Sequence, residues 1–91
     1  MTDTYQTLSF TETFLETFIG KDFTGNERKR LLKALRLLEE NERHPSLRVH
    51  ELRGDLTGVW SASASKELWV TFERISDGRK RLLTCSHHYA D

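Results

Sequence analysis

The sequence predicts an α+β fold, in which a helical hairpin packs on one face of a small, mainly antiparallel, twisted sheet. Two observations predict this class. Apolar residues recur at helical spacing between residues 12 and 43, and from residue 59 onward they alternate with polar residues as they do in strands. The expected order of elements is β-α-α-β-β-β, and a chain of 91 residues is expected to form one domain, residues 1–91.

The first three elements have local start and stop signals. Residues 5–10, YQTLSF, alternate like a short strand. Residues 12–19, ETFLETFI, place apolar side chains on one helical face, and Gly20 is expected to end that helix. The residues TGNE at 24–27 form a capping-box pattern that opens a second, amphipathic helix. This helix must end before Pro45, whose ring disfavours helical geometry at the preceding residue.

The apolar period changes from helical to extended after the second helix. Residues 46–54, SLRVHELRG, are expected to form an extended segment. Residues 59–65, VWSASAS, and 66–75, KELWVTFERI, are expected to be two antiparallel strands. The turn signal SDGR at 76–79 then leads into a third strand with the sequence KRLLTCS.

The expected strands have two chemically different faces. Apolar side chains such as Trp60, Ala62 and Val70 alternate with polar ones, and we expect the apolar face to lie against the helices. The opposite face is expected to have no cover and to hold the functional site; it carries Ser61, Ser63, Ser65 and Trp69. Four basic residues straddle the last hairpin turn and are expected to form a solvated edge: Arg74, Arg79, Lys80 and Arg81.

The formal charge of the chain is zero, but the charges are unevenly placed. Residues 1–27 contain Lys21 and five acidic residues, which gives −4, and residues 28–91 therefore carry +4. A basic C-terminal part is suited to a phosphate backbone. A mixed solvated surface explains so small a surplus almost as well, so charge alone does not decide the function.

The single cysteine and the absence of long apolar runs favour a cytoplasmic protein. Cys85 has no partner for an internal disulfide, which fits a reducing compartment, and its apolar surroundings predict a buried structural thiol. No apolar run approaches the roughly 18 residues of a membrane span, and the N-terminus lacks the pattern of a signal peptide.

Histidines stand at the expected ends of the sheet. His50 precedes the three strands, and the pair His87 and His88 follows them. This order could bring His50 and one of the pair together on one concave face, with Glu67 at the turn between the first two strands. Such groups suit metal-free RNA cleavage, because one removes the 2′-OH proton and another protonates the leaving 5′-oxygen. The sequence lacks zinc-ligand spacings such as HExxH or paired CxxC, so neither a metal nor a cofactor is expected.

Two stretches of the sequence carry a family resemblance. Residues 44–75, HPSLRVHELRGDLTGVWSASASKELWVTFERI, and residues 82–91, LLTCSHHYAD, resemble the RelE/ParE superfamily of toxins from type II toxin–antitoxin systems. The closest branch is that of the YafQ-like mRNA interferases. The markers are the bend at Pro45, the H-x-L-x-G of residues 50–54, the G-x-W of residues 58–60, the strand WVTF and the closing Ser86-His87.

The resemblance implies a toxin that cleaves mRNA on the ribosome without a metal and that a cognate antitoxin silences. By position, His50 and His87 match active-site histidines of the YafQ-type branch, and Glu67 stands where that branch has an acidic residue. These three are the predicted catalytic residues. The predicted RNA-binding residues are Arg48, Arg53, Lys66, Trp69, Arg81 and His88.

Some positions differ from the family pattern and leave alternatives open. Ser61 and Ser63 replace residues that are basic or histidine in relatives, and Trp69 stands where many members have an arginine. Trp69 could stack on a base, anchor an antitoxin, or simply pack. The alternative function is therefore a ParE-like toxin without nuclease activity, or a decayed toxin that only binds protein. The strand register decides whether His87 or His88 faces the site.

Overall fold

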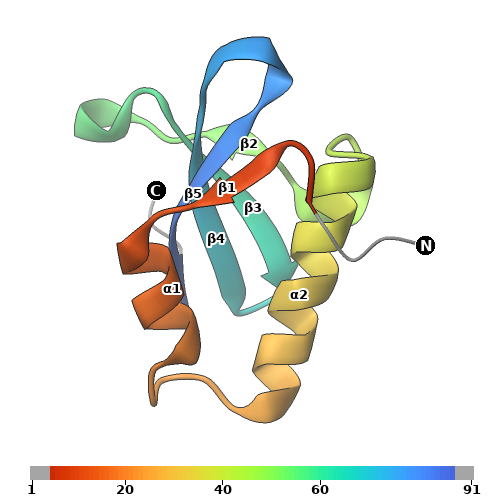
Figure 1. Ribbon diagram of the computed structural model, residues 1–91, viewed down its shortest axis with the longest axis vertical. Coiled ribbons are helices and arrows are strands. Elements are labelled where there is room, and N and C mark those ends of the chain that lie inside the picture. The colour runs from red at the N-terminus through yellow and green to blue at the C-terminus, as the bar shows by residue number, and fades with distance from the viewer. Residues whose placement is uncertain (1–4, 88–91) are drawn as a thin grey trace.

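Five strands form one mixed sheet, with two helices packed against it (Figure 1). The computed structural model describes residues 5–87. The strands lie in the order β1-β5-β4-β3-β2, and only β1 and β5 are parallel. This confirms the α+β class, and a short edge strand, β2, is added to the predicted order. The strands are β1 (Leu8–Phe10), β2 (His50–Glu51), β3 (Val59–Ser65), β4 (Leu68–Arg74) and β5 (Lys80–Ser86).

The first helix, α1 (Glu12–Ile19), begins and ends where its local signals predict. The hydroxyl of Thr11 accepts a hydrogen bond from the backbone N–H of Phe14 at 3.0 Å, which satisfies one of the free donors of the first turn. The same hydroxyl donates to the carbonyl of Leu82 in β5 at 2.9 Å. The cap therefore also fastens the start of α1 to the sheet.

The second helix, α2 (Gly25–Glu40), opens with the predicted capping box. The Glu27 N–H donates to the Thr24 hydroxyl at 3.1 Å, and the Thr24 N–H donates to the Glu27 carboxylate at 2.8 Å. The helix ends at Glu40, five residues before Pro45. In the part of the chain that the structure describes, no helix is both long enough and apolar enough to cross a membrane.

The segment that follows α2 is not the continuous extended stretch that the sequence predicts for residues 46–54. Residues Pro45–Leu47 form a 3₁₀ turn, η1, and the extended part is limited to β2. Proline fixes the dihedral angle that the first turn needs, and the ring of His44 caps that turn by accepting the N–H of Ser46 at 3.2 Å. Leu47 is fully buried, so burial of one side chain outweighs the alternating pattern.

The two long hairpins agree with the predicted turn signals. Asp77 and Gly78 have φ angles of 62° and 73°, the left-handed conformation that Asp and Gly adopt most readily in tight turns. They close the turn between β4 and β5. Between β3 and β4 the register shifts at Ser63–Ser65, and a second shift lies beside Phe72 in β4. Such irregularities increase the local twist of the sheet.

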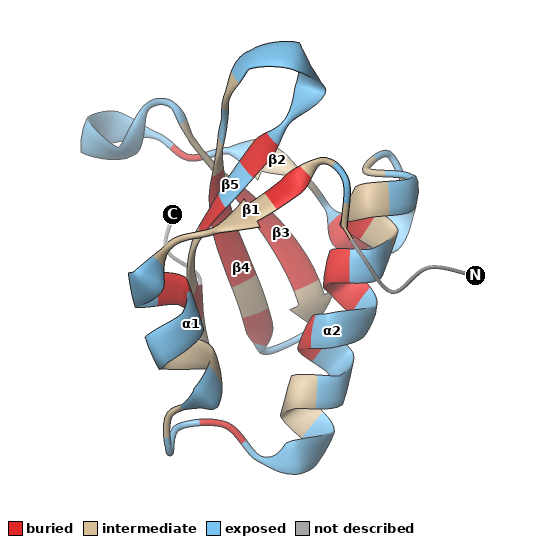
Figure 2. Ribbon diagram, viewed as in Figure 1, coloured by how far each residue is buried: buried red, intermediate tan, exposed pale blue. Residues whose placement is uncertain are grey.

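The hydrophobic core lies between the helices and one face of the sheet (Figure 2). Apolar side chains of α2 meet the central strands there, as the periodicity predicts. Cys85 is part of this core; burial raises the pKa of its thiol, and the Thr17 hydroxyl lies 3.4 Å away. This confirms a buried thiol. The largest fully buried apolar side chains of the core are Phe14, Phe72, Leu31, Leu38, Leu47, Leu68, Leu82 and Val70.

The second face of the sheet is not the open surface that the sequence predicts. Ser61, Ser63 and Thr71 are all buried on it. Register explains this, because larger side chains stand directly beside the small ones: His50 pairs with Ser61, and Trp69 pairs with Ser63. In the described part of the chain, the Ser61 hydroxyl is buried without a hydrogen-bond partner.

Candidate functional site

Arg48 has an unusual backbone conformation at the centre of the candidate site. It follows the η1 turn with φ 47° and ψ 46°, the left-handed region that a residue with a Cβ adopts only at a cost. Its backbone N–H donates to the Pro45 carbonyl, and its side chain is exposed. Strained residues of this kind are common at functional sites, so Arg48 is a natural starting point.

Arg48 lines a polar pocket of about 590 Å³ beside the turn between β3 and β4. Lys66, at that turn, lies on the same pocket. The structure therefore brings together two residues that the sequence predicted to bind RNA. Two cations around one hollow suit an anionic ligand. The lining residues are Pro45, Ser46, Arg48, Ser63, Ala64, Ser65 and Lys66.

A second pocket, of about 400 Å³, lies on the other side of Pro45 and Arg48, which line both hollows. It contains residues that the sequence analysis did not select. One of them, Arg74, was predicted to lie on a solvated edge, but it bonds to Glu42 and lies over the Trp60 ring. The lining residues are Glu42, Arg43, His44, Pro45, Arg48, Val49, Trp60 and Arg74.

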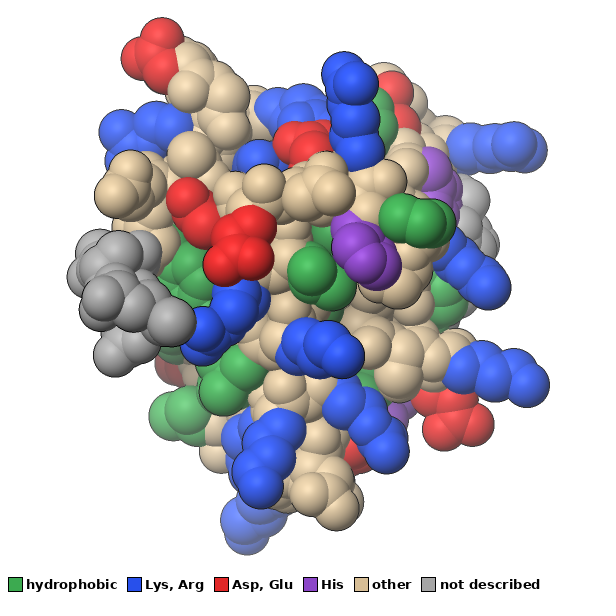
Figure 3. All heavy atoms as spheres, turned by 90° about the vertical axis from the view of Figure 1, so that its right-hand side faces the viewer, with side chains coloured by type: hydrophobic (Ala, Val, Ile, Leu, Met, Phe, Trp, Pro, Cys, Tyr) green, Lys and Arg blue, Asp and Glu red, His purple; other side chains and the backbone are tan. Residues whose placement is uncertain are grey.

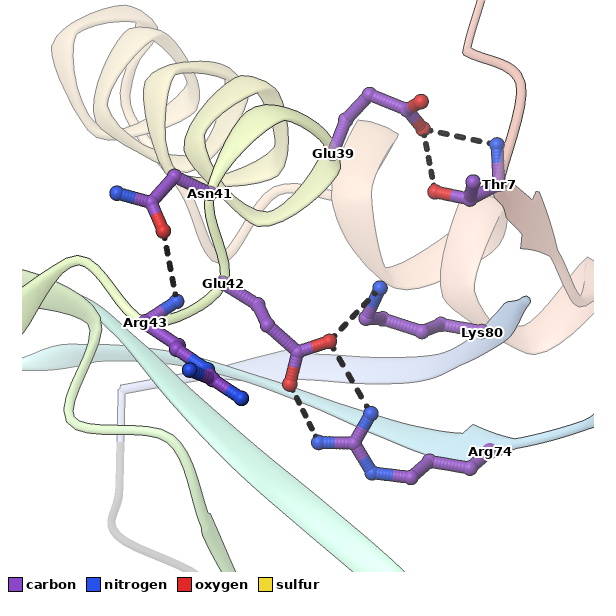
Figure 4. Close-up of polar contacts among 7 residues, drawn as sticks. All are labelled: Thr7, Glu39, Asn41, Glu42, Arg43, Arg74 and Lys80. Atoms are coloured by element: carbon purple, nitrogen blue, oxygen red, sulfur yellow. Dashed lines mark hydrogen bonds and ion pairs between the residues drawn. The ribbon is translucent and has the colours of Figure 1, made fainter. Parts of the chain in front are cut away.

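Glu42 holds two of the basic residues of the last hairpin (Figure 4). Both terminal nitrogens of Arg74 bond to its carboxylate, at 2.6 and 3.1 Å, and Lys80 Nζ lies 3.1 Å away. The hydrogen bonds from Arg74, joined by Lys80, lower the pKa of Glu42 to about 2 against the effect of partial burial. Lys80 is 5% exposed, so the predicted solvated edge is wrong for Lys80, whereas the Arg74 side chain is still 37% exposed. Arg74 lies two residues from Phe72, and Lys80 two residues from Leu82, so alternation places both on the core face. This spacing was the signal in the sequence that could have shown that they point towards the core.

The two histidines on either side of η1 are held in different tautomers. His50 Nδ1 lies 2.9 Å from the Arg48 carbonyl oxygen, which can only accept, so Nδ1 carries the proton and Nε2 is the basic nitrogen of the neutral ring. His44 Nδ1 instead accepts the N–H of Ser46, so its neutral ring carries the proton on Nε2. His50 is therefore suited to accept a proton and His44 to donate a hydrogen bond.

His87 lies apart from His50, contrary to the expected meeting of the strand ends. Its ring stacks on Phe23 with centroids 4.7 Å apart, and its Nε2 lies 3.1 Å from Glu27 Oε2, on the helix side of the sheet. Residues His50, Ser61, Thr71 and Thr84 are paired side by side across four strands, so His50 and Thr84 are three strand spacings, about 14 Å, apart. His87 lies a further three residues along the chain from Thr84. The alternation of the strand explains this, because His87 shares the face of Cys85. His88 lies outside the described residues.

The other predicted site residues are spread around the sheet. Glu67 is exposed beside Lys66, but it does not line the pocket. Trp69 is partly buried between Ser63 and Ser86. Arg53 is exposed at the start of the turn Gly54–Leu56, and Arg81 in β5 pairs with Glu73 in β4.

The surface on the α2 side is rich in basic side chains. Figure 3 shows Lys and Arg spread across most of this face. Among residues 5–87, Arg43 and Arg48 form no ion pair, so their charge is available to a ligand. Over the same range, no group of three or more His, Cys, Asp or Glu side chains is placed to hold a metal ion.

Comparison with known proteins identifies the fold. No family model matches the chain, and no curated protein matches it by sequence. Among solved structures, YafQ from E. coli superposes with a TM-score of 0.70 at 14% identity, covering 89% of this chain and 91% of that one. The YoeB/ParE toxin from Agrobacterium tumefaciens gives a TM-score of 0.65 at 21% identity, covering 92% of this chain and 100% of that one. This chain has the YoeB and YafQ toxin fold.

A third similar structure is a toxin–antitoxin complex. The toxin–antitoxin complex RelBE2 from Mycobacterium tuberculosis contains a chain that matches with a TM-score of 0.61 at 20% identity. The match covers 90% of this chain and 96% of that one. The toxin fold was predicted from the motifs of residues 44–91, and the superposed structures confirm it.

Proposed function

We propose that this protein is the toxin of a type II toxin–antitoxin pair and that it cleaves mRNA without a metal, acting on the translating ribosome. The observation that carries the proposal is the pocket that Arg48 and Lys66 line on a toxin fold. His50 does not line this pocket, but its ring bonds to the Arg48 carbonyl. The pocket supplies positive charge for the phosphodiester, and His50 supplies a base whose accepting nitrogen is fixed by a backbone hydrogen bond.

The reaction follows from these groups. The RNA 2′-oxygen attacks the adjacent phosphorus while its proton passes to His50 Nε2, and the bond between phosphorus and the 5′-oxygen breaks. Arg48 and Lys66 stabilise the charge that develops on the phosphate oxygens. The products are a 2′,3′-cyclic phosphate and a 5′-hydroxyl, and the 5′-oxygen takes up one proton as it leaves.

The residue that donates a proton to the leaving 5′-oxygen stays a prediction. His87 is the predicted donor, and this role requires its imidazole to leave Glu27 and Phe23 and to reach the other face of the sheet. Glu67 stays the predicted assisting carboxylate, next to Lys66 at the rim of the pocket. Neither role is needed for His50 to act as the base.

Inducible expression in a bacterial host tests the proposal. The wild-type protein is expected to arrest growth and to produce new 5′ ends in translated mRNAs, and His50→Gln is expected to abolish both while the variant stays folded. Arrest with no new 5′ ends, or unchanged cleavage by His50→Gln, would show the proposal to be wrong. Arg79→Gln is the matched control, because Arg79 is exposed on the opposite hairpin and lines neither pocket.

The antitoxin is expected to cover the apolar groove between α1 and α2. Leu15 and Leu32 are 49% and 44% exposed there, and Ile19 at the end of α1 is 72% exposed; apolar side chains so far exposed favour a protein partner. The RelBE2 complex supports an antitoxin as that partner. This groove also favours the second candidate function, a toxin that only binds protein, which predicts arrest without RNA cleavage. The groove is lined by Tyr5, Phe10, Phe14, Leu15, Phe18, Leu32 and Leu35.

A further inference from the structure

The second pocket, beside Trp60, contains a guanidinium that is held flat and partly exposed. The Arg74 guanidinium carbon lies 4.3 Å from the centre of the Trp60 ring, and its two terminal nitrogens both bond to Glu42. The Arg74 side chain is nonetheless 37% exposed. A guanidinium fixed in this way offers a planar surface on which an RNA base can stack.

The same pocket has donors for a phosphate. His44 lines it, and because His44 Nδ1 accepts the Ser46 N–H, the Nε2–H of the neutral ring is left as a hydrogen-bond donor. Arg43 and Arg48 line the pocket too, and within residues 5–87 neither forms an ion pair. The carboxylate of Glu42 is already bonded to Arg74 and Lys80, so it leaves Arg43 and Arg48 available to a ligand.

The position of the pocket connects it to the proposed cleavage site. Pro45 and Arg48 line both hollows, so the two pockets share Arg48. A volume of about 400 Å³ lies within the usual size range for sites that bind small organic ligands. Successive nucleotides of a single strand can therefore occupy the two pockets, with Arg48 between them.

We propose that the Trp60 pocket is a second nucleotide subsite for single-stranded RNA. The base stacks on the guanidinium of Arg74, and the phosphate binds Arg43, Arg48 and His44 Nε2–H. This inference rests on the proposed function, because the same strand passes through the Arg48–Lys66 pocket. The subsite fixes the strand on both sides of Arg48, and neither His44 nor Arg74 takes part in the bond cleavage.

Nuclear magnetic resonance titration with a 2′-O-methylated adenosine trinucleotide tests the subsite. This probe lacks the attacking hydroxyl, so binding is measured without cleavage. The indole N–H signal of Trp60 and the amide signal of Val49 are expected to shift at the same probe concentrations as those of Ala64 and Lys66. Trp69→Phe assigns the two indole signals.

Three variants and one control sharpen the test. His44→Gln and Arg43→Gln are each expected to weaken binding about tenfold, because a charge-assisted phosphate contact is lost. Arg74→Lys keeps the charge but loses the stacking plane, and a similar loss is expected. The matched control, Arg79→Gln, is expected to bind as the wild type does. The amide spectrum of each free variant shows whether it is folded.

The possible outcomes test the subsite proposal independently of the proposed nuclease function. Shifts confined to residues 63–66, or no shift at all, would overturn the subsite, whatever the growth assay shows. Shifts at Trp60 that His44→Gln and Arg43→Gln weaken would establish it, even if the protein fails to arrest growth and the nuclease proposal is lost.

Discussion

His87 Nε2 lies 3.1 Å from Glu27 Oε2, and this contact ties the end of β5 to the first turn of α2. Glu27 already accepts the Thr24 N–H through its other oxygen, so one carboxylate serves both the helix cap and the strand end. That backbone hydrogen bond, with help from His87, lowers the pKa of the Glu27 carboxyl. The predicted catalytic histidine therefore has a structural partner in this arrangement.

Replacing His87 is expected to lower stability through the stacked ring. His87→Ala loses the contact with Phe23 and is expected to reduce the free energy of unfolding by about 1 kcal/mol, measured by urea denaturation. His87→Phe keeps a stacked ring and is expected to recover most of this loss. Loss of RNA cleavage in the stable His87→Phe would show that the imidazole also acts in catalysis, whereas retained cleavage would leave it a structural role.

Acid is expected to weaken the link between α2 and the last hairpin. The pKa of Glu42 is about 2 in the folded protein and 4.5 ordinarily, so its contribution is complete above pH 4.5 and is lost as the pH falls towards 2. Allowing for solvent screening at this partly exposed cluster, the contribution is about 1 kcal/mol. Glu42→Gln is expected to remove this part of the pH dependence of the melting temperature; a curve unchanged below pH 4.5 would contradict it.

Arg48→Gly is expected to separate stability from function. Glycine adopts the left-handed conformation of this position without a Cβ penalty, so the free energy of unfolding should rise by up to about 1 kcal/mol. The same change removes the cation shared by the two pockets, so RNA binding should fall. Arg48→Gln, which keeps the strain and loses the charge, is the matched comparison and should weaken binding without the gain in stability.

Lys66 is expected to contribute to RNA affinity through its charge alone. Lys66→Gln should weaken binding similarly for all sequences and reduce the slope of log affinity against log salt by about one. Fluorescence titrations with a 2′-O-methylated oligonucleotide at several salt concentrations measure this slope. An unchanged slope would place the phosphate elsewhere, and Arg79→Gln should show the wild-type slope.

A charge in the groove between the helices is expected to block the antitoxin and to spare the toxin. Leu32→Lys places an ammonium among apolar side chains, so co-expressed antitoxin should no longer rescue growth, while arrest by the toxin alone persists. Leu56→Lys is the control, because Leu56 is 40% exposed but lies outside the groove. Full rescue of Leu32→Lys would show that the antitoxin binds a different surface.

The sequence by itself determined those features that depend on neighbours within a few residues. The capping box of Thr24 and Glu27, the turn at Asp77 and Gly78, and the alternation of the strands are all encoded locally, and each lies where it was predicted. The motifs of residues 44–91 also predicted the toxin fold. Arg48 and Lys66 were also predicted to bind RNA, and the structure places both of them on one pocket.

Only the tertiary structure decided the contacts between distant segments. The pairing of Arg74 and Lys80 with Glu42 joins residues more than 30 positions apart, and no local pattern indicates which carboxylate an arginine will meet. The same holds for the contacts of His87 with Glu27 and Phe23, and for the pocket that His44 and Arg43 share with Trp60. Propensity and periodicity are local properties, whereas a site is formed by packing, which brings together side chains that are far apart in the chain.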